Sequence, residues 1–413
     1  MRKIVLKTLK YLLFLLIGLI ISVNLFIILS GRFYIYKGIA NTYMVGQIGP
    51  SIYDLEIFPY STVKAGPNKS ELIRHENYNK ASLTAKNKEF IDTYQTKALL
   101  VFSGDTLLFE KYYDEHNENT VSNSFSVAKT LVALLIGIAV DEGHIKSLDE
   151  SISVYIPEFR NTDKKTITIR HLLAMASGLD WKESGKNPLS DNAESYYGTD
   201  LRGHVTGQSV EIEPGKLFNY QSGNSQLLGF ILEKATGVGL NEYAEEKIWK
   251  RIGAEHDAFW SLDKENGDEK AFCCMYATAR DYGRLGQVIL NGGKYNGVQI
   301  IPEDYFNEMI IPTDLNTKEN IPNYRYGLHI WTYQSDDGQV NYCRGVNGQY
   351  IISIPDENLL IIRLGSKKMQ NYFIPDENKA DEMFVEQNKY KVGHSEGLFE
   401  YISMGKLIRT KTE

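Results

Sequence analysis

The chain has 413 residues, which is enough for one large domain or for two or three domains of average size. Hydrophobic residues make up 43% of it and charged residues 23%, proportions that are typical of an ordinary globular protein. The net charge is −7 and no long basic run occurs, so the composition speaks against nucleic-acid binding.

The N-terminus predicts a membrane anchor over residues 1–30. Residues 11–29 carry no charged side chain and, as a helix, would span roughly 28 Å, close to the hydrocarbon thickness of a bilayer. Four basic residues precede this segment and two follow it closely, so the positive-inside rule places the N-terminus in the cytoplasm and the rest outside. A cleaved signal peptide is the alternative, but its apolar core is usually shorter and ends at small residues, which Ser30-Gly31-Arg32 fits poorly.

The next segments lead from the anchor into a folded domain. Residues 31–84 mix Gly, Pro, Tyr and Lys without clear periodicity, and we expect a stalk or a wrapped extension there. From residue 85 onward we expect a single domain that continues to residue 413. Residues 98–102 and 106–112 predict the two strands of a β-hairpin, because a Gly-Asp turn separates two apolar runs.

The apolar helix predicted after Ser126 is the most informative segment. Residues 131–140 are apolar on every face, which is typical of a buried helix, and Asn123 or Ser124 can cap its start. Ser126 and Lys129 lie three positions apart and therefore share one face of the helix. A buried lysine loses its proton readily, and a neutral amine beside a hydroxyl is a base beside a nucleophile. The pair predicts serine acyl transfer.

The Ser-x-x-Lys pattern alone has little specificity. It occurs three more times in the chain, beginning at Ser61, Ser261 and Ser403. Those copies lie in polar stretches, and only at Ser126 would the pair point into an apolar interior.

Two later segments can supply the proton relay and the oxyanion hole that acyl transfer requires. Tyr220 begins a Tyr-Gln-Ser triplet and can pass the serine proton to a leaving group, although Tyr-x-Ser recurs at Tyr333. Residues 344–349 form a Gly-flanked entry to a strand, where the backbone can approach a ligand closely.

The cysteines and histidines do not predict a metal site. Cys273, Cys274 and Cys343 would allow a disulfide in an outward-facing domain, but their odd number and the adjacent pair leave the pairing open. Neither their spacing nor that of the eight histidines matches zinc ligation. We expect no metal and no cofactor.

Strand signals return near the C-terminus, over residues 328–333, 349–354 and 359–364. An amphipathic stretch at residues 398–408 is expected to pack on these strands. Strands at both ends of the domain predict one sheet, built from about 85–125 and 300–413. The helical fragments between them predict a helical lobe over about 141–300.

In this order the motifs resemble those of the class C β-lactamase-related serine hydrolases. That family has Ser-x-x-Lys, then Tyr-x-Asn or Tyr-x-Ser, then a Lys- or His-led triplet that ends in Gly. The similarity covers about residues 85–366 and extends beyond the motifs to segments 123–129, 169–179, 213–224 and 271–281. The Tyr-Gln-Ser form and the last segment resemble the branch that includes the 6-aminohexanoate-dimer hydrolases. The resemblance implies an α+β fold of the β-lactamase/transpeptidase type, with an antiparallel sheet flanked by helices and an all-α lobe.

The resemblance also implies roles for individual residues. Ser126 would be the acylated nucleophile, Lys129 its activating base and Tyr220 the proton relay. Ser222 would take the place of the polar residue in the second motif. The backbone N–H groups of Ser126 and Gln349 would form the oxyanion hole.

The third motif departs from the family pattern, because the aligned triplet is Val346-Asn347-Gly348. Valine neither carries a proton nor attracts a carboxylate, so β-lactam hydrolysis and D-alanyl carboxypeptidase activity are disfavoured. Arg344 would face the same side of the strand and can replace the charge, although a solvated surface arginine is the expected alternative. Tyr197 lies on the loop that is expected to form one wall of the cleft. It would be either a substrate contact or a structural residue.

We therefore expect a serine hydrolase that cleaves a small-molecule ester or amide through a Ser126 acyl-enzyme. It would be a single-pass protein of a bacterial cell membrane, with its catalytic domain outside the cytoplasm. Two alternatives stay open, a penicillin-binding or β-lactamase-type enzyme and a catalytically silent wall- or peptide-binding module.

Overall fold

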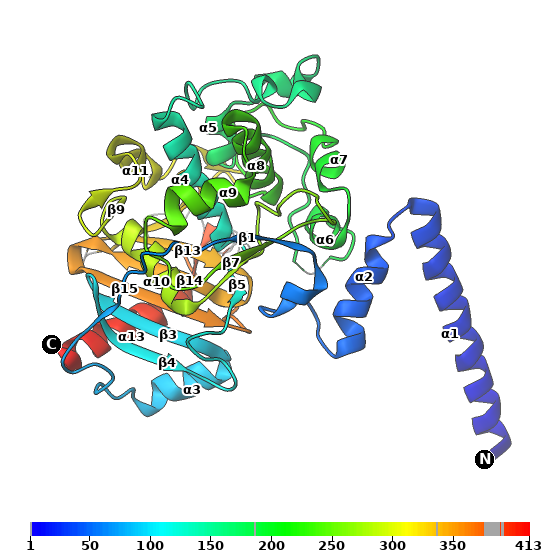
Figure 1. The fold of residues 1–413 in the computed structure, drawn as a ribbon. Helices are drawn as coiled ribbons and strands as arrows, with labels where there is room; N and C mark the ends of the chain where they lie inside the picture. Colours follow the sequence, from blue (N-terminus) through cyan, green and yellow to red (C-terminus); the bar gives the residue numbers. More distant parts are fainter. Residues whose placement is uncertain (1, 186, 336–337, 376–388, 390–391) are drawn as a thin grey trace.

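The computed structural model describes residues 2–413 except 186, 336–337, 376–388 and 390–391 (Figure 1). Its largest sheet has seven strands. In spatial order they are β12 (Trp331–Ser335), β13 (Gly338–Gly345), β14 (Gln349–Ile354), β15 (Leu359–Gly365), β3 (Thr96–Ser103), β4 (Thr106–Tyr112) and β2 (Ile73–Arg74). Neighbouring strands are antiparallel except β2, which pairs parallel with β4.

Both faces of this sheet are covered, which is why its central strands β14 and β15 are buried along their whole length. Side chains alternate between the faces, so Ile351 and Ile362 pack on one side while Ile352 and Ile361 pack on the other. Helix α10 (Ala279–Leu290) covers the first face and α13 (Glu396–Thr412) covers the second.

The helical lobe surrounds one buried helix. Its helices are α4 (Val127–Asp141), α5 (Ile169–Leu173), α6 (Asp191–Tyr197), α7 (Leu201–Thr206), α8 (Ser222–Thr236) and α9 (Leu240–Ala244). Helix α4 is buried from Val127 to Ala139, as its apolar sequence predicts, and it packs against α8. Helix α11 (Glu303–Met309) contacts α4, and α3 (Ala85–Thr93) packs with α13 on the second face of the sheet.

The lobe region also contains strands that the sequence did not indicate. A second sheet has the order β1 (Tyr60–Val63), β7 (Ala258–Ser261), β8 (Met275–Ala277) and β5 (Ser122–Asn123). Elsewhere among the described residues, two-residue strands form three more pairs. These are β9 (Lys294–Tyr295) with β10 (Val298–Gln299), β6 (Leu217–Phe218) with β11 (Asn316–Thr317), and β16 (Tyr372–Phe373) with β17 (His394–Ser395).

The N-terminal segment has two parts. Helix α1 (Arg2–Ser30) is long and apolar enough to cross a membrane, and it stands apart from the domain in Figure 1. Helix α2 (Tyr34–Asn41) lies between α1 and the domain, where it packs against α6. The rest of residues 31–84 also lies on the domain, because β1 pairs with β7 and β2 with β4.

Several expected elements are observed, and two need correction. The hairpin is β3–β4, and the strands expected at 349–354 and 359–364 are β14 and β15. The strand expected at 328–333 begins only at Trp331, because His329 has a left-handed backbone (φ +61°) that a strand does not accommodate. The N-cap of α4 is Ser126 itself, because Asn123 and Ser124 are both engaged by the backbone of Phe125.

Candidate active site

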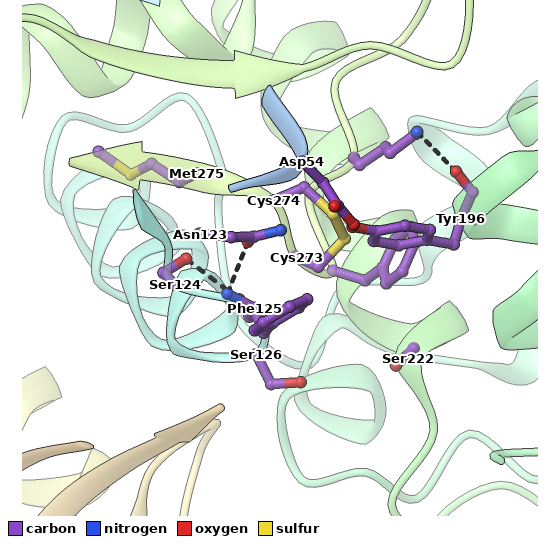
Figure 2. Close-up of a disulfide and its surroundings, with 12 residues drawn as sticks. Asp54, Asn123, Ser124, Phe125, Ser126, Tyr196, Ser222, Cys273, Cys274 and Met275 are labelled. Carbon is purple, nitrogen blue, oxygen red and sulfur yellow. Dashed lines mark hydrogen bonds between the residues drawn. A yellow bond between two sulfur atoms is a disulfide. The ribbon is translucent and has the colours of Figure 1, made fainter. Parts of the chain in front are cut away.

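Ser126 stands at the N-terminus of α4, at the end of a tightly held turn. Phe125 has φ +47°, and its N–H donates to Asn123 Oδ1 at 2.8 Å. The N–H of Ser124 donates to the carbonyl of Met275 at 2.8 Å, which ties the turn to β8. As the N-cap residue, Ser126 makes no capping bond with its side chain. Its hydroxyl is therefore available for other partners, and in Figure 2 it points toward the side on which Ser222 lies.

Lys129 lies one helical turn further on and is 1% exposed. Its Nζ donates to Ser126 Oγ at 3.1 Å and to the carbonyl oxygen of Phe272 at 2.6 Å. Burial lowers the pKa of this amine from its ordinary value of 10.5 to about 8, and the negative charge of Glu183 acts in the opposite direction. At pH 7 roughly a tenth of the amine is therefore neutral, and this form can accept the proton of Ser126.

Tyr220, just before α8, lies near both Lys129 and Ser126. The centre of its ring is 5.5 Å from Lys129 Nζ, and the ring packs on Trp331 at 5.4 Å. Burial and the charge of Glu183 raise the pKa of its phenol well above 10, while a hydrogen bond with Ser126 lowers it. The phenol is therefore protonated at neutral pH and can donate a proton.

Glu183 is a site residue that the sequence analysis missed. Its carboxylate accepts from the backbone N–H and hydroxyl of Ser222 (2.7 and 2.9 Å), from Trp181 Nε1 (2.8 Å) and from Asn192 Nδ2 (2.8 Å). Four donors thus fix one carboxylate whose charge acts on both the lysine and the tyrosine. The sequence does not mark this residue, because its link to the site runs through Ser222, which lies 39 positions away in the chain.

The serine opens into a cavity that is open to solvent. Ser126, Ser222 and Tyr197 all line it, so the structure brings these three predicted residues together. Glu183 lines it as well.

The third motif forms a short turn, η7 (Val346–Gly348), between β13 and β14. Val346 is 37% exposed and lines the cavity with Ser126. Asn347 turns away, since its side-chain amide donates to the carbonyl oxygen of Pro50 at 3.1 Å. The described lining of the cavity includes neither Asn347 nor Gly348.

Gln349 is fully buried, and its side chain holds the turn. Its side-chain amide donates to the carbonyl oxygens of Val346 (2.8 Å) and Gly365 (2.7 Å). The carbonyl of Gly348 accepts from the Arg363 guanidinium at 2.7 Å. Among the lining residues that the structure describes, Gln349 does not occur.

Strand β13 makes its close approach to the nucleophile earlier, at Gly345. A side chain at this position would come within 2.3 Å of the carbonyl oxygen of Ser124, so only glycine lets the strand lie against the Ser126 turn. Val346 is the next residue after Gly345, so its backbone lies close to this contact.

Arg344 is not a solvated surface residue, contrary to the expected alternative. It is half-buried, and its guanidinium lies 4.2 Å from the centre of the Trp331 ring. Its positive charge lowers the pKa of Tyr220. Within the part of the chain that the structure describes, Arg344 Nη1 has no hydrogen-bond partner.

Two of the three cysteines lie beside the candidate active site. A disulfide joins the adjacent residues Cys273 and Cys274, beside the turn that carries Ser126 (Figure 2). Cys273 lines the cavity, and the preceding residue, Phe272, provides the carbonyl that accepts from the lysine. Cys343 is buried and free. The described residues contain no group of three or more His, Cys, Asp or Glu that could hold a metal ion.

Comparisons with known proteins agree with this architecture. The family model described as Beta-lactamase matches residues 89–379. The 6-aminohexanoate-dimer hydrolase of Paenarthrobacter ureafaciens is 26% identical over 296 residues, which cover 66% of this chain and 72% of that protein.

Two solved structures show the same fold. A Bacillus anthracis protein provisionally named a 6-aminohexanoate-dimer hydrolase superposes with a TM-score of 0.69 at 23% identity, over 87% of this chain and 94% of that one. The octameric penicillin-binding protein homologue from Pyrococcus abyssi gives a TM-score of 0.54 at 19% identity, over 68% of this chain and 73% of that one. The expected β-lactamase/transpeptidase-like fold is confirmed, and the chain belongs to the Beta-lactamase family of serine hydrolases.

Proposed function

We propose that this chain is a membrane-anchored hydrolase that cleaves an ester or amide through an acyl-enzyme on Ser126. The observation that carries the proposal is the 3.1 Å contact between Ser126 Oγ and the buried amine of Lys129, on the wall of a cavity. A nucleophile needs a base within hydrogen-bond reach, and burial supplies a base that is partly neutral at physiological pH.

The reaction begins when the neutral Lys129 amine takes the proton of Ser126 and Oγ attacks the substrate carbonyl carbon. The tetrahedral intermediate carries one negative oxygen, which the N–H of Ser126 at the start of α4 can stabilise. We place the second donor at the backbone N–H of Gln349. Gln349 pairs with Gly345, the residue at which β13 lies against the Ser126 turn.

The leaving group then receives a proton from the Tyr220 phenol, and the phenol regains one from the Lys129 ammonium. Collapse of the intermediate breaks the ester or amide bond and leaves the acyl group on Ser126. Water attacks this acyl group with the same two groups acting in reverse, which restores the free serine.

The other predicted residues take supporting roles in this proposal. Ser222 stands beside the reacting groups and is oriented by Glu183, while Tyr197 forms part of the wall that substrate contacts. Asn347 and Gly348 hold the turn that presents Val346.

We place helix α1 in a bacterial cell membrane as an uncleaved anchor, with the catalytic domain outside the cytoplasm. Its length and composition support this placement. The intact mass of the membrane-extracted protein tests it, because cleavage of a signal peptide would remove the mass of the N-terminal segment.

The nucleophile is tested with a fluorescent fluorophosphonate probe. Wild-type chain should be labelled and Ser126→Ala should not. Ser403→Ala is the matched control, because Ser403 begins another Ser-x-x-Lys pattern but lies exposed on α13. Full labelling of Ser126→Ala would refute the assignment, and no labelling of the wild type would favour the catalytically silent alternative.

A fluorescent penicillin provides the second probe. Val346 offers no positive charge for the carboxylate of a β-lactam, so we expect no covalent capture. Stoichiometric capture that disappears in Ser126→Ala would instead establish the penicillin-binding alternative.

A further inference from the structure

We propose that the cavity beside Ser126 holds the apolar chain of an amphiphilic ester or amide. The proposal rests on the proposed function, since it names the substrate class of the same site. It is carried by the composition of the cavity wall, by the way that wall is held, and by the apolar rim at its mouth.

One wall of the cavity comes from α2 and the residues that follow it. Its large side chains are aliphatic or aromatic, namely Tyr34, Ile35, Ile39, Tyr43 and Ile48. Phe125, Phe272 and Tyr196 line it from the domain side. Among the lining residues that the structure describes, Glu183 alone carries a formal charge. Such a lining favours hydrocarbon, because each buried methylene gains free energy on leaving water.

Helix α2 is fixed in this position by close packing. A Cβ on Gly38 would lie 3.3 Å from the ring of Tyr197, so the backbone of α2 rests directly on α6. The hydroxyl of Tyr34 donates to the carbonyl oxygen of Pro188 at 3.1 Å. The apolar wall is therefore preformed and does not need substrate to assemble it.

Part of the cavity rim consists of apolar side chains that are exposed to water. Tyr43 and Ile48 line the cavity, yet they are 63% and 94% exposed, and the neighbouring Met44 is 77% exposed. Exposed apolar side chains that cluster at a cavity mark a binding surface. This cluster follows α2 directly, and α2 is the first helix after the membrane-length helix α1.

The test uses the full chain in phosphatidylcholine nanodiscs and measures the second-order rate at which Ser126 is labelled by alkyl fluorophosphonates. The probes carry ethyl, butyl, hexyl and octyl chains. Each methylene that enters the cavity should raise the rate by about threefold to fourfold. Octyl should therefore exceed ethyl by about 700-fold if all of its additional methylenes enter, and by at least about tenfold if only two of them do. These probes need no turnover, so the result does not depend on whether the natural substrate is an ester or an amide.

A matched pair of variants tests whether the alkyl chain of the probe lies against the cavity wall that α2 forms. Ile39→Asp places a charge on the cavity wall and should lower the octyl-to-ethyl rate ratio at least about fivefold. Ala40→Asp places the same charge on the next residue, which is exposed and outside the described lining, and should leave the ratio unchanged. If Ile39→Asp does not fold, Ile39→Trp narrows the same space with an apolar group and should also lower the ratio.

A hexadecyl probe embedded in the nanodisc tests whether the amphiphile enters the cavity from the bilayer or from water. Labelling of Ser126 by this probe would show that the amphiphile can reach the site from the bilayer. Labelling by the octyl probe alone would assign the cavity to a water-soluble amphiphile.

Two other results would count against the reasoning in different ways. Equal labelling rates for all chain lengths, with the label on Ser126, would overturn the apolar-chain inference and leave the nucleophile intact. Absence of any label on Ser126 would overturn the proposed function itself.

Discussion

The lowered pKa of Lys129 makes the rate of acylation depend on pH in a defined way. The change from 10.5 to about 8 corresponds to about 3 kcal/mol in favour of the neutral amine. At pH 7 roughly a tenth of the amine is then neutral, about 300 times the fraction of an ordinary lysine. The rate of Ser126 labelling should rise about tenfold for each pH unit below 8 and level off above it.

Glu183→Gln perturbs this dependence without touching the nucleophile or its base. The carboxylate favours the protonated amine, so its removal should move the midpoint of the pH profile to lower pH. A midpoint lowered by about half a pH unit would make labelling about threefold faster at pH 6, relative to the plateau of the same variant. Normalising to the plateau separates the charge effect from any loss of the bonds to Ser222.

The assay is the labelling rate with the ethyl fluorophosphonate, measured from about pH 5.5 to about pH 9.5. Glu213→Gln serves as the control, because Glu213 is exposed and pairs with Lys216 at the surface. Its midpoint should match the wild type. A wild-type midpoint near 10 would refute the buried neutral base, and a midpoint that rises in Glu183→Gln would refute the electrostatic link.

Three further predictions concern the rest of the site. Tyr220→Phe should lower turnover of any ester that the wild type hydrolyses by about 10²- to 10⁴-fold while the unfolding temperature changes little, and unchanged turnover would exclude it as the proton relay. Gly345→Ala should destabilise the fold by about 1–3 kcal/mol in thermal unfolding, since its Cβ would meet the Ser124 carbonyl, whereas Gly49→Ala has open space and should be neutral. Thiol titration should find one group, Cys343, reactive only in denaturant, and three after reduction; three before reduction would contradict the disulfide.

The elements that the sequence predicted well are those with an uninterrupted run of apolar residues. The all-apolar run of α4 and the strands β14 and β15 have one environment along their length, so composition alone identifies them. Strand β13 was missed because polar residues interrupt it, among them Asn341 and Arg344. It is a strand because β12 and β14 pair with it on both sides, and that pairing overrides local propensity.

In the candidate site, contacts within one helix could be predicted from the sequence, whereas contacts between distant segments could not. Ser126 and Lys129 are one helical turn apart, so their contact follows from spacing once the helix is known. Glu183 meets Ser222 across 39 positions of irregular chain, and α2 meets the Ser126 cavity from a segment without periodicity. Such contacts depend on how distant segments pack, and no local pattern in a single sequence encodes them.

The charges around the cavity disfavour a substrate that carries a carboxylate, although the groups for acyl transfer are present. Glu183 places a negative charge on the lining, and Val346 contributes no positive one. The half-buried guanidinium of Arg344 stacks on Trp331, and its charge acts on Tyr220. A substrate carboxylate would thus meet repulsion and no compensating cation in the described lining.

The reacting groups belong to α4 and the start of α8, whereas the apolar wall belongs to α2. Substitutions in α2 can therefore change which chain enters the cavity without altering the distance between nucleophile and base. It follows that exchange of α2 should change the chain-length preference of labelling while the pH midpoint set by Lys129 stays in place.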